Sequence, residues 1–306
     1  MKTSGSIVRG VCPVVSATFH EQGSLDVESF SALCEHVLGT RVQSLMIFGV
    51  ATENSKLTDS ERETMLKSLV TARGSLDTTI VATVADHGTR IAQERARRWV
   101  EMGADSINIL PSYFLRPSKE EVLDHVAAIL ESVTVPVILQ SLPSGGDEVP
   151  LRDFLELNQT YGHLRQVKIE NLPASPLVSE VTAYDNGQVS ALVGWGGLEW
   201  LEATQAGAVG VQPGCSLTEL YLDAQSHLDN NDLDGFASQF SPLRPALTAW
   251  MRHPEVLIAI EKFILYKRGI IASDTTRRPS SRLLASDYEL AEEHIQIMSD
   301  RQGASR

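Results

Sequence analysis

Strand and helix patterns alternate regularly along this chain up to about residue 215. Eight short apolar or β-branched runs predict buried strands, at Val11–Val15, Ser44–Phe48, Thr79–Val84, Ser106–Leu110, Val135–Leu139, Arg165–Ile169, Val189–Val193 and Val209–Gln212. Amphipathic stretches between them predict helices, among them Val27–Leu38, Ser60–Ala72, Arg90–Met102, Lys119–Ser132 and Leu198–Gln205. Because parallel strands need a long connection between them, this alternation predicts a parallel sheet.

Eight strand–helix units favour a closed (β/α)8 TIM barrel over a doubly wound open sheet, and no Gly-rich dinucleotide fingerprint follows the first strand. We predict the barrel over residues 1–230 and a C-terminal helical extension over residues 231–306. Helical patterns near and within this extension lie at Leu217–Leu228, Leu233–Phe240, Glu255–Lys267 and Tyr288–Met298. Since active sites of such barrels lie at the C-terminal ends of the strands, function is expected there.

Local signals mark the ends of several predicted helices. Glycine permits a left-handed cap, and the glycines expected to end helices in this way are Gly39, Gly103 and Gly207. Capping boxes satisfy the first N–H groups of a helix, and we predict three of them, starting at Thr58, Ser118 and Ser216.

Composition limits the class of function. A chain of 306 residues, 42% of them hydrophobic, can bury one barrel-sized core, and its formal charge of −13 opposes binding to nucleic acids. Its three cysteines are widely spaced and odd in number, so we expect neither disulfides nor a paired-cysteine zinc site. Few unpaired cysteines are typical of a reducing compartment, so we expect a cytoplasmic location. With neither an N-terminal apolar leader nor an apolar run of membrane-spanning length, no contact with a membrane is expected.

Lys168 is the first candidate for chemistry. It stands near the end of the sixth predicted strand, in HLRQVKIEN, where it would project into the mouth of the barrel. An amine held among apolar walls loses its proton more easily and can attack a carbonyl. The competing interpretation is a structural ion pair with Glu170, two positions further on.

Three further segments carry weaker signals. In the turn Gly49–Glu53, backbone N–H groups and the Thr52 hydroxyl could hold a carboxylate, although an ordinary loop fits as well. Tyr113 offers a phenol for proton transfer, or simple packing beside Pro111. The glycines of Gly207–Gly214 could cradle a phosphate, but they also suit a tight turn. No histidine cluster has ligand spacing, so we expect no metal.

Taken together, these segments resemble the family of dihydrodipicolinate synthase and N-acetylneuraminate lyase, which are class I aldolase-type barrels. The similarity spans nearly the whole chain. The motifs that carry it are GVCP, GVATE before KLTDSER, PSYFLRPSKEE, LQSLP, VKIE, GWGG and GAVGVQPG, in the order of the family. Their joint occurrence is specific, whereas no single one is diagnostic.

The resemblance implies roles for particular residues. Lys168 would form the Schiff base, Tyr113 would relay a proton from a neighbouring subunit, and Gln140 would stand at the second relay position. Substrate binding would fall to residues in the loops after the second and seventh strands and at the end of the eighth strand, namely Val50, Ala51, Thr52, Gly194 and Gln212.

Departures from the family pattern also matter. Val50 and Ala51 occupy positions where the family commonly has two hydroxyl residues, and Gln140 replaces a tyrosine, so two of three relay hydroxyls are missing. The entrance arginine of the synthase has become Gly145 or Gly146, which argues against lysine biosynthesis. The chain looks like a divergent branch of the family with Gln after the fifth strand.

We therefore expect a cytoplasmic homo-oligomeric lyase, a dimer or tetramer, that forms an imine between Lys168 and a small 2-oxo acid such as pyruvate. The imine itself supplies the electron sink, so no cofactor is expected. Two alternatives stay open. One is a dehydratase of a 2-keto-3-deoxy sugar acid, and the other is an oxo-acid-binding pseudoenzyme.

Overall fold

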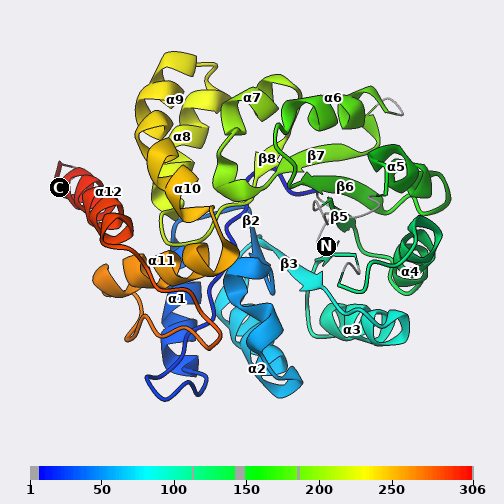
Figure 1. Cartoon of the computed structure of the whole chain (residues 1–306), viewed down its shortest axis with the longest axis horizontal. Coiled ribbons are helices and arrows are strands. Elements are labelled where there is room, and N and C mark those ends of the chain that lie inside the picture. Colours follow the sequence, from blue (N-terminus) through cyan, green and yellow to red (C-terminus); the bar gives the residue numbers. More distant parts are fainter. Residues whose placement is uncertain (1–6, 112–113, 142–148, 185–186, 305–306) are drawn as a thin grey trace. The chain divides into compact units, whose positions relative to one another are not determined.

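A computed structural model describes residues 7–111, 114–141, 149–184 and 187–304. Over these ranges eight strands form one sheet in the order β1-β8-β7-β6-β5-β4-β3-β2, and every adjacent pair is parallel (Figure 1). The strands are β1 Gly10–Val11, β2 Ser44–Ile47, β3 Thr79–Val84, β4 Ser106–Ile109, β5 Val137–Ser141, β6 Leu164–Ile169, β7 Ser190–Val193 and β8 Gly210–Val211. The first strand pairs with the last, and the predicted (β/α)8 barrel is confirmed.

Twelve α-helices follow or separate the strands in the part of the chain that the structure describes. They are α1 Val27–Gly39, α2 Asp59–Arg73, α3 Thr89–Glu101, α4 Lys119–Glu131, α5 Leu151–Thr160, α6 Ser175–Ala183, α7 Trp200–Gln205, α8 Thr218–Asp229, α9 Leu233–Phe240, α10 Arg244–Trp250, α11 Pro254–Lys267 and α12 Ala285–Ala304. Within the described ranges, none of them has the length and apolar character needed to cross a bilayer.

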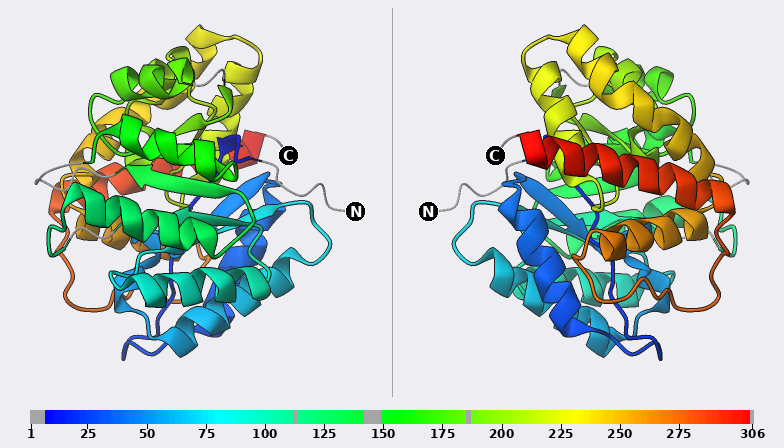
Figure 2. Two further views of the ribbon diagram at one scale, coloured as in Figure 1. Left: turned by 90° about the vertical axis from the view of Figure 1, so that its right-hand side faces the viewer. Right: turned by 90° about the vertical axis from the view of Figure 1, so that its left-hand side faces the viewer.

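Internal contacts divide the chain into two compact units. The first comprises residues up to Cys12, Gln43–Ile47 and Thr79–Gln212, and it holds all eight strands together with α3 to α7. The second comprises Pro13–Val42, Phe48–Thr78 and the residues from Pro213 onward, with α1, α2 and α8 to α12. In the first unit, α3 to α7 lie side by side in chain order (Figure 2). A separate extension starting at residue 231 stays a prediction.

The sheet is the core of the first unit. Its strands are buried almost throughout, as expected for parallel strands covered on both faces. Gln166 of β6 is a polar exception, because its side chain bonds both main-chain groups of Val8, with Oε1 accepting from N at 2.7 Å and Nε2 donating to O at 2.9 Å. A buried polar side chain is tolerated here because its hydrogen bonds are satisfied.

Two of the three predicted capping boxes are confirmed. At Thr58 and Ser118 the side-chain oxygen accepts a hydrogen bond from the main-chain N–H three residues further on. The glutamate at that third position accepts one in turn from the main-chain N–H of the capping residue. The prediction at Ser216 is wrong, since α8 starts after Leu217 without a side-chain cap. The Ser216 N–H donates instead to Glu261 Oε2 at 2.8 Å. A carboxylate distant in sequence thus satisfies the N–H group that a glutamate within the capping box would have satisfied.

The predicted glycine caps are confirmed at Gly103 and Gly207, where φ is 108° and 109°. The prediction at Gly39 is wrong, because this residue is the last one of α1. Thr40 follows in a right-handed conformation and its N–H and hydroxyl both donate to Val37 O. The chain turns left-handed only at Arg41, with φ of 64°.

The pairing of β1 with β8 generates a test of the fold. A Cβ added to Gly210 would stand 2.5 Å from Gly10 O and 3.0 Å from Gly10 N. Both atoms belong to the main chain, so the strands would have to separate, and we expect Gly210→Ala to lower the free energy of unfolding by about 1–3 kcal/mol.

The matched control is Gly39→Ala, where nothing lies within 4 Å of the added Cβ. It should leave stability unchanged or raise it by up to about 1 kcal/mol, since alanine is the better helix former. Urea unfolding midpoints compare the two variants. Equal midpoints would show that β1 and β8 tolerate separation.

Candidate active site

Lys168 is the second-last residue of β6 and is buried, with 6% of its surface exposed. Its Cα is in register with Gln140 of β5 on one side and with Leu192 of β7 on the other. The structure thus places Lys168 near the C-terminal end of its strand, as the sequence predicts. This is the end of a parallel barrel strand at which catalytic groups are found.

The ammonium group of Lys168 contacts a carboxylate. Lys168 Nζ lies 2.7 Å from Glu170 Oε1, and both side chains are nearly buried. Residues two apart along a strand direction face the same side, which brings these two together. The ion pair considered as the competing interpretation of Lys168 is therefore present. It does not exclude chemistry, because a carboxylate at this distance can also accept the proton that an amine must lose before attacking a carbonyl.

Glu170 is held on several sides. Its Oε1 accepts a hydrogen bond from Gln140 Nε2 at 3.1 Å, and its Oε2 accepts one from Trp195 N at 3.0 Å. The indole N–H of Trp195 donates to the main-chain O of Glu170. A Cβ on Gly194 would stand 2.3 Å from this carboxyl group, so only glycine allows the approach. Gly194 and Trp195, in the loop after β7, therefore fix the position of the carboxylate.

Gln140 continues a line of buried polar side chains across neighbouring strands. Asn108 of β4 donates from Nδ2 to Gln140 Oε1 at 3.0 Å and to Thr83 Oγ1 of β3 at 3.2 Å. Gln140 then donates from Nε2 to Glu170. Since an amide does not ionise near neutral pH, Gln140 orients the carboxylate and does not itself take up a proton.

Gln212, after β8, lies beside Cys12. Its Nε2 donates to Cys12 Sγ at 3.5 Å, and both residues are buried. Burial raises the pKa of the Cys12 thiol, while hydrogen bonds to Ser44 and Gln212 and the charge of Lys168 lower it in part. The thiol stays protonated, so Cys12 is no nucleophile here. The other amide atom, Gln212 Oε1, has no hydrogen-bond partner among the described residues and could accept one from a ligand.

In the second unit, the residues Val50–Thr52 form a tight 3-10 turn, η1. The Thr52 hydroxyl donates to Val15 O at 2.6 Å, and the Thr52 N–H donates to Gly49 O at 3.0 Å. Neither is then available to an anion. Within the described ranges the N–H groups of Val50 and Ala51 have no hydrogen-bond partner, so these are the donors that the turn offers.

The remaining predicted residues lie outside the part that is described. Tyr113 belongs to the undescribed pair 112–113, and Gly145 and Gly146 to the segment 142–148. Their predicted roles stay predictions.

Sequence reasoning did not assign a function to Glu170, Trp195 or Asn108. Glu170 entered only as an ion-pair partner, although its two-residue spacing from Lys168 on a strand is a signal that both face one side. Asn108 lies between Ile107 and Ile109 in a fully buried strand, and a polar residue in such a position usually bonds another polar group. The main-chain N–H of Trp195 leaves no such signal.

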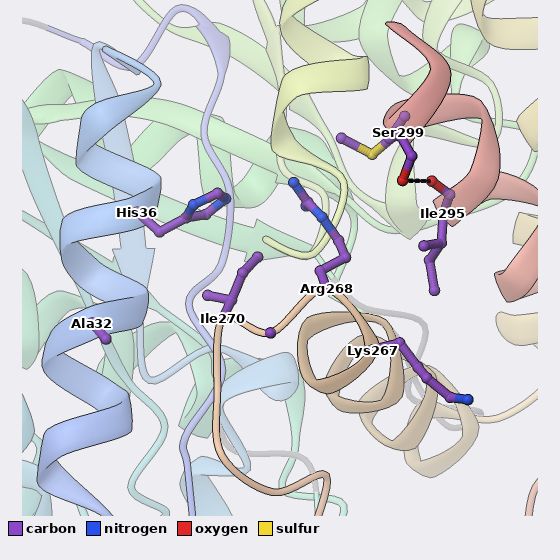
Figure 3. A pocket seen from close by; sticks show the side chains of 9 residues that line it. Ala32, His36, Lys267, Arg268, Ile270, Ile295 and Ser299 are labelled. Atoms are coloured by element: carbon purple, nitrogen blue, oxygen red, sulfur yellow. Dashed lines mark hydrogen bonds between the residues drawn. The ribbon is translucent and has the colours of Figure 1, made fainter. Parts of the chain in front are cut away.

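A pocket of about 530 Å³ in the second unit contains none of the predicted site residues (Figure 3). It lies between α1, the end of α11 and α12, and is lined in part by His36 and Arg268. Glu219 already contacts both, at 3.0 Å from His36 Nε2 and 2.6 Å from Arg268 Nη2. Since Arg268 already pairs with Glu219, its guanidinium group is not free to bind a 2-oxo acid.

Comparison with known proteins identifies relatives of this chain. L-2-keto-3-deoxyarabonate dehydratase of Azospirillum brasilense is 21% identical over 282 residues, which cover 90% of this chain and 89% of the dehydratase. 4-Hydroxy-tetrahydrodipicolinate synthase of an Exiguobacterium species is 29% identical over 136 residues, so the match covers about half of each protein, 44% of this chain and 46% of the synthase.

A solved structure shares the fold. The catalytic lysine mutant of the sialic acid aldolase of Ruminococcus gnavus superposes with a TM-score of 0.85 and 19% sequence identity, covering 97% of both chains. A model of the dihydrodipicolinate synthetase family matches residues 7–214. This match covers more than half of the chain and confirms the resemblance seen in the sequence, so the chain belongs to the dihydrodipicolinate synthetase family.

Proposed function

We propose that this lyase acts through an imine between Lys168 and the C2 carbonyl of a small 2-oxo acid. The observation that carries the proposal is the buried contact of 2.7 Å between Lys168 Nζ and Glu170 Oε1. It joins the nucleophile and a proton acceptor at the end of a barrel strand. The sialic acid aldolase of the same fold is described as having a catalytic lysine, which supports this assignment.

Glu170 serves as the acid and base for imine formation. Its carboxylate takes one proton from the Lys168 ammonium group, and the neutral amine attacks C2 to give a carbinolamine. The protonated Glu170 returns the proton to the departing hydroxyl, which leaves as water. The product is a protonated imine, and the Glu170 carboxylate is restored. Gln140 and the Trp195 N–H keep this carboxylate aimed at the reacting atoms.

The substrate carboxylate binds to the N–H groups of Val50 and Ala51. Thr52 acts indirectly, because its hydroxyl ties the turn to Val15 O. Gly194 leaves room for the Glu170 carboxylate, and Gln212 Oε1 accepts a hydrogen bond from the substrate.

Two bond-breaking reactions can follow from the same imine, since it withdraws electrons and gives an enamine. In an aldolase, a carbon–carbon bond breaks and an aldehyde leaves. In a dehydratase, a β-hydroxyl leaves as water. Dehydration of a 2-keto-3-deoxy sugar acid is the favoured second candidate, because the similarity to the Azospirillum dehydratase extends over 90% of this chain.

We further propose a homo-oligomer, a dimer or tetramer, in the cytoplasm. The basis for the oligomer is Tyr113, which matches the family tyrosine that reaches a neighbouring subunit. The basis for the location is the presence of free, buried thiols at Cys12, Cys34 and Cys215.

Borohydride trapping tests the imine. With pyruvate, reduction should attach a three-carbon acid to Lys168 through a secondary amine, which cannot hydrolyse back. Peptide mass spectrometry locates the label, and Lys168→Ala should carry none. A label on Lys56 or Lys267, or one that persists in Lys168→Ala, would contradict the assignment. If trapping succeeds but no hydroxy-oxo acid in a panel is turned over, the oxo-acid-binding pseudoenzyme is supported instead.

Replacing Glu170 tests the proton transfer. Glu170→Gln keeps the shape and hydrogen-bonding capacity of the side chain but cannot take up a proton, so imine formation at saturating pyruvate should slow by about 10²–10⁴-fold. Timed borohydride quenching measures this rate.

The control for charge is Glu180→Gln, which removes a carboxylate from the exposed face of α6 and should leave the rate unchanged. Urea unfolding of Glu170→Gln shows whether the fold is retained. A folded variant that forms the imine at the wild-type rate would reduce Glu170 to a structural partner of Lys168.

A further inference from the structure

The turn that offers its N–H groups to an anion ends at Glu53, in the second unit. Glu53 has φ of 56° and ψ of 34°, and its N–H donates to Val50 O at 3.0 Å, which closes the turn. A left-handed conformation is unfavourable for a residue with a side chain, so surrounding contacts must hold it. Whatever holds the Glu53 side chain therefore holds the turn.

The Glu53 carboxylate is fully buried and contacts three segments of the chain. Its Oε1 pairs with Lys262 Nζ of α11. Its Oε2 lies 3.2 Å from Lys56 Nζ and accepts a hydrogen bond from the Arg277 N–H at 3.0 Å. Two of these partners, Lys262 and Arg277, come from the region beyond residue 250.

The charges around this pair are balanced. Lys56 also contacts Glu255 at 2.6 Å, and Arg277 pairs with Glu61 through its guanidinium group. The Arg277 guanidinium lowers the pKa of Glu61 to about 2. Since Lys56 and Arg277 each have a carboxylate of their own, Lys262 is the cation whose charge Glu53 chiefly compensates.

Lys262 is fully buried, with no exposed surface. Its Nζ donates to Thr275 O at 2.8 Å and stands 4.2 Å from the centre of the Phe19 ring. Burial lowers the pKa of this ammonium group to about 8, while the charge of Glu53 acts in the opposite direction. Apolar residues at two such positions are usually as stable as an ion pair or more so, because both charges must leave water. Stability alone thus gives no reason for this pair.

We propose that Lys262 is a positioning residue, which through Glu53 holds the turn Val50–Thr52 in the conformation that binds the substrate carboxylate. This inference rests on the proposed function, because it assumes that the turn receives the carboxylate of a 2-oxo acid. Lys262 touches no reacting atom. It acts on carboxylate binding and not on the proton transfers at Lys168.

The decisive variant removes both charges. Lys262→Met alone leaves a buried carboxylate short of its main partner, and Glu53→Gln alone leaves a buried ammonium group, so either can fail to fold. The double variant Glu53→Gln/Lys262→Met is uncharged and close in shape, and it should fold. It still lacks the ionic contact that fixes the turn.

The experiment measures the concentration of a carbonyl compound that gives half-maximal borohydride trapping at Lys168, and the trapping rate at saturation. Two probes are used: pyruvate, and hydroxyacetone, a ketone of similar size without a carboxylate. In the double variant the half-saturating pyruvate concentration should rise roughly tenfold or more, the loss expected for hydrogen bonds to a charged group. Its saturated rate, and its half-saturation by hydroxyacetone, should match the wild type.

Lys267→Met is the matched control, since it makes the same substitution on the same helix at an exposed lysine, 3.5 Å from Glu292. It should change neither probe. Wild-type half-saturation by pyruvate in the folded double variant would overturn the inference and leave the imine intact. So would an equal rise for both probes. Failure of the wild type to be trapped at Lys168 would instead remove the proposed function, and this inference with it.

Discussion

A buried ammonium group must have a carboxylate beside it, and this requirement organises both units of the chain. The cost of removing a lone charge from water exceeds what any single hydrogen bond returns. Lys168 meets the requirement through Glu170 at 2.7 Å, and Lys262 through Glu53. The neighbours of each pair then have to supply hydrogen bonds to the carboxylate oxygens that the lysine leaves free. Polar side chains and loop N–H groups consequently gather around both pairs, at positions that packing alone would fill with apolar residues.

The sequence predicts the barrel well, because its signals are local and repeated. Strand β3 and helix α9 have the predicted bounds, since each is set by the residues within it. The first strand is shorter than predicted and ends at Val11, although the Val14 N–H still donates to Pro213 O at 2.8 Å. Helix α10, Arg244–Trp250, was not predicted at all. It begins with Pro245 in its first turn and is only two turns long, too short to show helical periodicity.

The site is predictable only in part, for a physical reason. Lys168 and Gln140 stand on strands, where position along the strand fixes direction, so their placement follows from the pattern. The contacts that give them a role come from residues distant in sequence. Trp195 reaches Glu170 through its main-chain N–H, which any residue except proline possesses. Ser216 carries the sequence signal of a helix cap, yet its N–H bonds to Glu261, 45 residues away. No local pattern reports such partners.

The pairing of Gln140 with Glu170 accounts for the most conspicuous departure from the family pattern. A tyrosine at position 140 would donate one hydrogen bond and could release a proton. Gln140 donates from Nε2 to Glu170 but cannot ionise, so in the proposed mechanism the two tasks are divided, with Gln140 donating the hydrogen bond and Glu170 transferring the proton. This arrangement requires the Glu170 carboxylate to lie close both to Lys168 and to the loop after β7. Any side chain at position 194 would occupy that space. Gln140, Glu170 and Gly194 therefore depend on one another. If a tyrosine replaced Gln140 while Glu170 is present, Glu170 Oε1 would have a phenol as its donor in place of the amide. The amide oxygen that accepts the hydrogen bond from Asn108 would be lost as well.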